Sequence, residues 1–293
     1  MDFGLALPSY REGASSEGIE AAAETAARLG WQGVFTTDHL LVEPSELSAD
    51  YYQVFDALIT LAYLAPLQPD LRLGISVVVV PMRNALVLAK ELATLDALSR
   101  GRLIVGVGVG WNETEFANVG AADRFHRRGA YLSEAIAIWR HLWGGGNGPF
   151  EGRFHSFDEV RFGPLPAQGA SVPLWAGGRH EAALRRAGEL ADGYHATASS
   201  PAQLAVRAPV VRRAAEQAGR PMPLISARLR VAFGSNEGRS YVLAGTPEQM
   251  ISEVHSFLDL GVEQLTFDFR ETDAERLASL MQRFDGEVLA AFR

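Results

Sequence analysis

The sequence predicts an α/β protein of the (β/α)8 TIM barrel class. Eight short apolar runs alternate with longer segments of helical spacing, from one end of the chain to the other. The 293 residues allow about 37 residues for each strand and helix unit, which favours a closed barrel over an open doubly wound sheet. We therefore expect residues 1–293 to form a single barrel domain.

The predicted strands are short, nearly continuous in apolar residues and rich in β-branched side chains, as strands covered on both faces should be. In chain order they are residues 3–7, 33–37, 71–80, 103–109, 172–176, 193–196, 224–231 and 264–269. The segments between them have helical periodicity. In the first of these, Ile19, Ala22 and Ala26 share one face.

Several boundaries are marked by local chemistry. The segments Ser200-Pro201-Ala202-Gln203 and Thr246-Pro247-Glu248-Gln249 each combine a capping residue, a first-turn proline and a capping-box partner, so each predicts a helix start. Residues 144–169 begin with Gly-Gly-Gly-Asn-Gly and have no regular periodicity. We interpret them as an insertion before the fifth strand.

Composition excludes several classes of protein. The chain has no cysteine, which removes disulfides, thiolate metal sites and cysteine nucleophiles. With 35 acidic and 27 basic residues its net charge is -8, so a nucleic-acid partner is not expected. The first residues lack the features of a signal peptide, and the longest apolar run, near residues 75–80, is too short to span a membrane. We expect a cytoplasmic protein without a membrane partner.

In a parallel barrel the active site lies at the carboxyl ends of the strands, so polar residues there are the first candidates. His39 follows Asp38 at the end of the second strand, where an imidazole beside a carboxylate suits a general acid or base. The alternative is a loop histidine bonded to the backbone. Gly177 and Gly178 precede a predicted helix and would let backbone N–H groups approach a phosphate, although a glycine pair also simply makes a turn.

The glycines between Gly106 and Gly110 do not match a dinucleotide-binding motif, because the third glycine that opens the Rossmann helix is missing. They fit the close approach of a flat ring, with Trp111 and Asn112 beside it, or else a tight barrel position that accepts no side chain. His180 and Glu181 resemble the start of a zinc-binding helix, but Leu184 stands where the second histidine is required. No metal site is predicted.

Five separated segments together resemble the bacterial luciferase-like monooxygenase superfamily, and most closely its branch that uses the deazaflavin coenzyme F420. The segments lie in the order found in that superfamily and cover most of residues 1–270. They are Thr37-Asp38-His39, residues 74–84 with 92–96, residues 106–112, residues 150–154 and residues 173–178.

The resemblance implies a barrel that holds a deazaflavin at the carboxyl ends of its strands. His39 would be the catalytic acid or base, Asp38 would contact the ring system, and Trp111 would face the substrate. Ser76 and Val77 would occupy a strand bulge, where the superfamily often has a non-prolyl cis peptide behind the ring. The remaining cofactor residues would line the ring or hold the phosphate, and they are Val79, Val109, Gly110, Asn112, Gly177, Gly178, His180 and Glu181.

The expected function is therefore hydride transfer between F420 and a small organic substrate. Two alternatives stay open: an FMN-dependent monooxygenase of the same superfamily, and a flavin-binding protein without catalytic activity. Relatives that oxidise glucose 6-phosphate carry a glutamate at the position of Trp111 and bind the sugar phosphate with lysines, whereas Lys90 is the only lysine here. That substrate is not expected.

The superfamily also suggests the state of assembly. Homodimers are common in it, so a homodimer is expected. The short segment 236–244 leaves little room for the longer loop that heterodimeric luciferases carry near the seventh strand.

Overall fold

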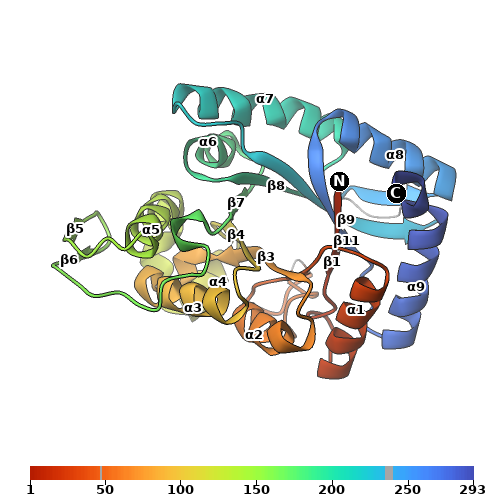
Figure 1. The fold of residues 1–293 in the computed structure, drawn as a ribbon, viewed down its shortest axis with the longest axis horizontal. Coiled ribbons are helices and arrows are strands. Elements are labelled where there is room, and N and C mark those ends of the chain that lie inside the picture. The colour runs from red at the N-terminus through yellow and green to blue at the C-terminus, as the bar shows by residue number, and fades with distance from the viewer. Residues whose placement is uncertain (47, 235–239) are drawn as a thin grey trace.

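The computed structural model describes residues 1–46, 48–234 and 240–293, and it shows a closed barrel of eight parallel strands surrounded by helices (Figure 1). The strands follow one another around the barrel in chain order, and the last one, β11, pairs with β1 to close it. The predicted (β/α)8 TIM barrel is thus confirmed. Residues 236–239 of the segment discussed above lie outside the described residues.

All eight predicted strands are present, with ends shifted by at most two residues. They are β1 (Asp2–Ala6), β2 (Gly33–Thr36), β3 (Arg72–Val79), β4 (Leu103–Gly108), β7 (Leu174–Gly177), β8 (Gly193–Thr197), β9 (Leu224–Phe233) and β11 (Val262–Asp268). The predicted boundaries succeed because these runs are apolar on both faces and are bounded by glycine or polar residues.

The helices run outside the strands. They are α1 (Ser16–Arg28), α2 (Ala57–Leu67), α3 (Ala85–Leu98), α4 (Glu113–Asn118), α5 (Arg128–Trp143), α6 (Glu181–Leu190), α7 (Pro201–Gln217), α8 (Pro247–Asp259) and α9 (Ala274–Glu287). Both predicted capping boxes are confirmed, at Ser200 with Gln203 and at Thr246 with Gln249. Throughout the described part of the chain, every helix is too short or too polar to cross a membrane.

Three short strands were not predicted. The insertion contains a small antiparallel pair, β5 (Phe150–Glu151) and β6 (Ser156–Phe157), which projects beyond α5 in Figure 1. The strand β10 (Val242–Gly245) pairs with the far end of β9, beyond the part of β9 that pairs with β8. Each of these strands has four residues or fewer, which is too short for an alternating pattern to be recognised.

Side chains fill the barrel interior on the side away from the carboxyl ends of the strands. Phe35, Ile104 and Trp175 form one buried cluster there. Glycines on neighbouring strands make room for the rings: a Cβ on Gly74 would lie 2.1 Å from Phe35, and one on Gly193 would lie 2.3 Å from Trp175. This packing leaves the carboxyl ends of the strands, where barrel active sites lie, as the place to look for a site.

Candidate active site

Asp38 ties the end of β2 to the end of β3. Its buried carboxylate accepts a hydrogen bond from the Val79 N–H (2.8 Å) and one from the Arg83 guanidinium (2.6 Å). Burial alone would lower the pKa of Arg83, but the carboxylates of Asp38 and Asp56 outweigh it and raise that pKa. Both oxygens of Asp38 therefore have partners within the protein.

His39 is held by a carboxylate that sequence reasoning missed. Its Nδ1 lies 2.9 Å from Oε2 of Glu115, which is buried in α4. The ring stacks on Tyr51 with centroids 4.2 Å apart, and Trp111 meets it edge-on at 6.0 Å. Trp111 is 47% exposed, so this group of rings borders solvent at the mouth of the barrel.

Asn112 caps the helix that carries Glu115. Its Oδ1 accepts a hydrogen bond from the Glu115 N–H (3.1 Å), and its Nδ2 donates to Oε2 of Glu43 (2.6 Å). That bond lowers the pKa of Glu43. Asn112 is buried, and these contacts fix the start of α4 against the loop that follows β2. Capping residues of this type were recognisable from sequence, but the partner glutamates were not.

The predicted bulge in β3 is present. The register between β3 and β4 shifts between Ile75 and Val78, and the Ser76–Val77 peptide bond is cis. Val77 is half-buried, and a Cβ on Gly177 would lie 3.3 Å from it, so these two residues meet inside the mouth of the barrel.

Val79 and Gly110 lie to one side of the bulge. Val79 is buried in a small apolar cluster with Met82 and Phe116, and a Cβ on Gly110 would meet both Val79 and Phe116. Gly110 has a φ of +74°, a conformation that favours glycine. Val109, the residue before it, is half-buried.

A buried polar layer lies beneath the bulge. His195 on β8 bonds to the Ser76 hydroxyl through Nε2 and to the Ser226 hydroxyl through Nδ1, each at 2.7 Å. Burial, and to a smaller extent the charge of Arg228, lowers the pKa of His195 to about 3. Arg228 on β9 donates to the Ser76 carbonyl (2.9 Å) and pairs with Asp268 on β11 (2.8 Å).

Arg228 and Asp268 were not predicted as site residues. The signal for Arg228 was an arginine in the middle of a mostly apolar strand, where a buried charge is stable only when it is paired. The layer extends to Tyr10, whose hydroxyl donates to Asp268 (2.7 Å). Burial and the neighbouring carboxylate of Asp268 raise the pKa of Tyr10.

The start of α6 supplies backbone donors. Gly178 is exposed with a φ of +132°, and its carbonyl accepts a bond from the Tyr194 hydroxyl (3.0 Å). His180 occupies the capping position but makes no side-chain capping bond, and Glu181 instead pairs with Arg185 in the next turn (2.7 Å). The exposed glycine and the uncapped first turn suit an anionic group such as a phosphate.

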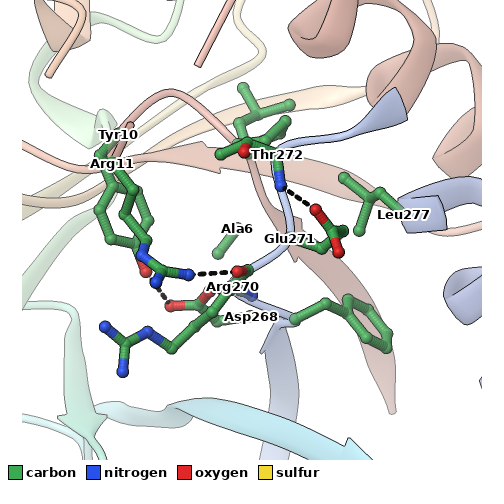
Figure 2. A pocket seen from close by; sticks show the side chains of 11 residues that line it. Ala6, Tyr10, Arg11, Asp268, Arg270, Glu271, Thr272 and Leu277 are labelled. Atoms are coloured by element: carbon green, nitrogen blue, oxygen red, sulfur yellow. Dashed lines mark hydrogen bonds between the residues drawn. The ribbon is translucent and has the colours of Figure 1, made fainter. Parts of the chain in front are cut away.

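The residues around a pocket beside the polar layer make contacts that hold the loop after β2 in place (Figure 2). In the figure Arg11 donates to the Arg270 carbonyl, and Tyr10 donates to Asp268. Arg11 and Arg270 also both pair with Asp50 in the loop. The next residue, Tyr51, is the one that stacks on His39.

Comparison with known proteins gives a family match. The family model described as "Luciferase-like monooxygenase" matches residues 1–287. The F420-dependent glucose-6-phosphate dehydrogenase 1 of Rhodococcus jostii (strain RHA1) is 26% identical in an alignment covering 73% of this chain and 77% of that protein. The pyrimidine monooxygenase RutA of Escherichia coli (strain SMS-3-5 / SECEC) is 33% identical over 142 residues, which are 46% of this chain and only 38% of RutA.

Solved structures show the same fold. An F420-dependent secondary alcohol dehydrogenase in complex with an F420-acetone adduct superposes with a TM-score of 0.83 over 99% of this chain and 98% of its own, at 18% identity. The oxygenating constituent of 3,6-diketocamphane monooxygenase from Pseudomonas putida, in complex with FMN, has a TM-score of 0.75 over 98% of each chain, at 14% identity.

Proposed function

Because the chain belongs to the luciferase-like monooxygenase family, we propose that it is an F420-dependent oxidoreductase that acts on a small organic substrate. The observation that carries the proposal is His39, held by a buried carboxylate at the mouth of the barrel beside the β3 bulge. The relative from Rhodococcus jostii, whose name states F420 dependence, supports the choice of cofactor.

The residues at the mouth fit a deazaflavin. Val77, Val109 and Gly177 are half-buried, so they offer an apolar surface for a flat ring. The first turn of α6, with Gly178, His180 and Glu181, would hold the phosphate through its free N–H groups. When bound, F420 would supply or accept a hydride.

The protein residues then manage a proton and orient the substrate. His39 would exchange the proton that accompanies the hydride, because its ring lies at the edge of the mouth and is fixed by Glu115 and Tyr51. Trp111 would form a wall of the substrate site, since it is exposed and makes a T-shaped contact with His39. Asp38 would act indirectly by fixing Val79 at the end of β3.

Glucose 6-phosphate is not the substrate that we propose. Lys90 lies on α3, and its ammonium group donates to the Gly163 carbonyl and sits 4.6 Å from the centre of the Phe162 ring. Both partners belong to the insertion. The only lysine of the chain is therefore engaged away from the residues assigned to the cofactor.

An FMN-dependent monooxygenase is the second candidate. Its support is the partial match to RutA and the likeness in fold to an FMN-bound monooxygenase. The two candidates differ in cofactor and in their use of oxygen.

Spectral titrations of the purified protein with oxidised F420 and with FMN test the proposal. We expect saturable binding of F420, and spectral reduction or oxidation of the bound cofactor by members of a panel of small alcohols and carbonyl compounds. Binding of FMN alone, with oxygen uptake after mixing with reduced FMN, would favour the second candidate. Binding of F420 that no substrate oxidises or reduces would indicate a binding protein without activity.

A histidine variant tests the role of His39. His39→Ala should keep F420 affinity and slow turnover on the order of 100-fold or more, as loss of a general acid or base does. The matched control is His255→Ala, because His255 is exposed on α8 and contacts only Phe292 among the aromatic rings described. Equal turnover in both variants would show that His39 is not the acid or base.

A further inference from the structure

We infer that Glu115 is a positioning residue that keeps His39 protonated at Nδ1 and leaves Nε2 as the atom that exchanges a proton with the substrate. The tautomer follows from the contacts of the two side chains alone. The use of Nε2 on a substrate rests on the proposed function.

Glu115 has little freedom to move. Its side chain is 2% exposed, and its Oε1 accepts a hydrogen bond from the Leu40 N–H at 2.5 Å while Oε2 faces Nδ1 of His39. Its own N–H is bonded to Asn112, which caps α4. The carboxylate is thus tied both to the residue that follows His39 and to the helix that carries it.

These contacts decide which ring nitrogen of His39 carries the proton. A carboxylate can only accept hydrogen bonds, so Nδ1 at 2.9 Å must be the donor. In neutral imidazole the other nitrogen, Nε2, then has a free lone pair. Across residues 1–46, 48–234 and 240–293, no hydrogen bond engages Nε2.

The same arrangement keeps the ring in place while a proton moves. Stacking on Tyr51 holds one face of the ring, and Trp111 lies against it in a T-shaped arrangement. When Nε2 takes a proton from a substrate hydroxyl, the imidazolium that forms faces the carboxylate of Glu115, which stabilises it. No lysine or arginine pairs with Glu115 in the described structure, so protonated His39 is the cation that its carboxylate would stabilise.

A purely structural role for Glu115, joining α4 to Leu40, predicts a different result on substitution. Glu115→Gln retains the size of the side chain and an oxygen for the Leu40 N–H. Its amide nitrogen would then face His39 and donate, which would force Nδ1 to accept and move the proton to Nε2. The contact between α4 and Leu40 would therefore be kept in Glu115→Gln, but Nε2 of His39 would lose its free lone pair.

The experiment is ¹⁵N NMR of the imidazole nitrogens in the protein without added cofactor, with the His39 signals identified by their loss in His39→Gln. We expect a protonated Nδ1 in the wild type and a protonated Nε2 in Glu115→Gln. Glu115→Asp, which keeps the carboxylate, should retain the wild-type tautomer. A protonated Nε2 in the neutral wild-type ring would overturn the inference without any variant.

Turnover with F420 gives the second readout. Glu115→Gln should lower kcat on the order of 100-fold or more and leave F420 affinity and KM within about threefold, and Glu115→Asp should recover part of the loss. The matched control is Glu113→Gln, because Glu113 is exposed on the same helix and lies 3.6 Å from the exposed His126. Wild-type kcat in Glu115→Gln would contradict the inference, whereas failure to bind F420 would reject the proposed function and leave the NMR result valid.

Discussion

The buried pair of Arg228 and Asp268 gives the sharpest prediction for stability. Their side chains are 9% and 7% exposed, and they meet at 2.8 Å in the polar layer beneath the β3 bulge. Asp268→Asn keeps the size and an oxygen acceptor but removes the negative charge. The guanidinium of Arg228 then stays buried without a counter-charge, a change that costs about 3–5 kcal/mol in other proteins.

Because asparagine keeps one oxygen that can accept from Arg228, we expect a loss of unfolding free energy near the lower end of this range, at about 3 kcal/mol. This is a large share of the roughly 5–15 kcal/mol by which folded proteins are stable. The assay is urea unfolding followed by circular dichroism at pH 7. The double variant Arg228→Met with Asp268→Asn should cost less than the sum of the single changes, because it removes both charges.

An exposed ion pair provides the control. Arg283 and Glu287 pair at 3.1 Å on α9 with side chains 49% and 44% exposed, so Glu287→Gln should change the unfolding free energy by less than about 1 kcal/mol. If Asp268→Asn cost no more than this control, the charge of Arg228 would not depend on its partner and the reasoning would be refuted.

Three further predictions concern a pH effect, a packing contact and assembly. The native pKa of His195 is about 3 and its ordinary value is 6.5, so between these pH values the unfolded chain binds a proton that the folded chain does not. The free energy of unfolding should therefore fall as the pH drops from 6.5 toward 3, and it should fall less steeply in His195→Gln. Urea unfolding at several pH values measures both. Gly74→Ala should destabilise the protein by about 1–3 kcal/mol, because the new Cβ would lie 2.1 Å from the buried Phe35 ring. The control Gly286→Ala should not destabilise it, since a Cβ at Gly286 would have no atom within 4 Å. Thermal unfolding of the two variants makes the comparison. We expect the apolar outer face of α2 to be covered in a homodimer, so Ile59→Glu (71% exposed) should give monomers in analytical ultracentrifugation and Val206→Glu (74% exposed, on α7) should not.

The sequence was sufficient to predict the strands and the end of the barrel at which the candidate residues gather. Strand runs are local patterns, and in a parallel barrel all carboxyl ends share one rim, so His39 and Gly178 could be assigned to that rim without coordinates. The partners of these residues could not be predicted in this way. His39 and Glu115 are 76 positions apart, and Glu115 belongs to a helix of six residues whose inner face gives no clear periodic signal.

The polar layer shows a second limit of sequence reasoning. Arg228 and Asp268 lie 40 positions apart on neighbouring strands, and Ser76 is 152 positions from Arg228. Only the closed barrel brings them together. An arginine within an apolar strand indicates that a buried partner exists, but not which of the carboxylates of the chain it is.

His39 and His195 differ in their surroundings, and this difference bears on which of them suits the proposed proton exchange. His39 follows β2, and His195 lies within β8 two residues before its end, so the sequence places both near the carboxyl end of a strand. Both ring nitrogens of His195 bond to serine hydroxyls, and burial lowers its pKa to about 3, so it stays neutral and has no nitrogen left for a substrate. His39 uses only Nδ1, on a carboxylate that would stabilise the charged ring. The hydrogen-bond partners therefore favour His39 for the proton exchange that we propose, whereas His195 supports the β3 bulge through Ser76.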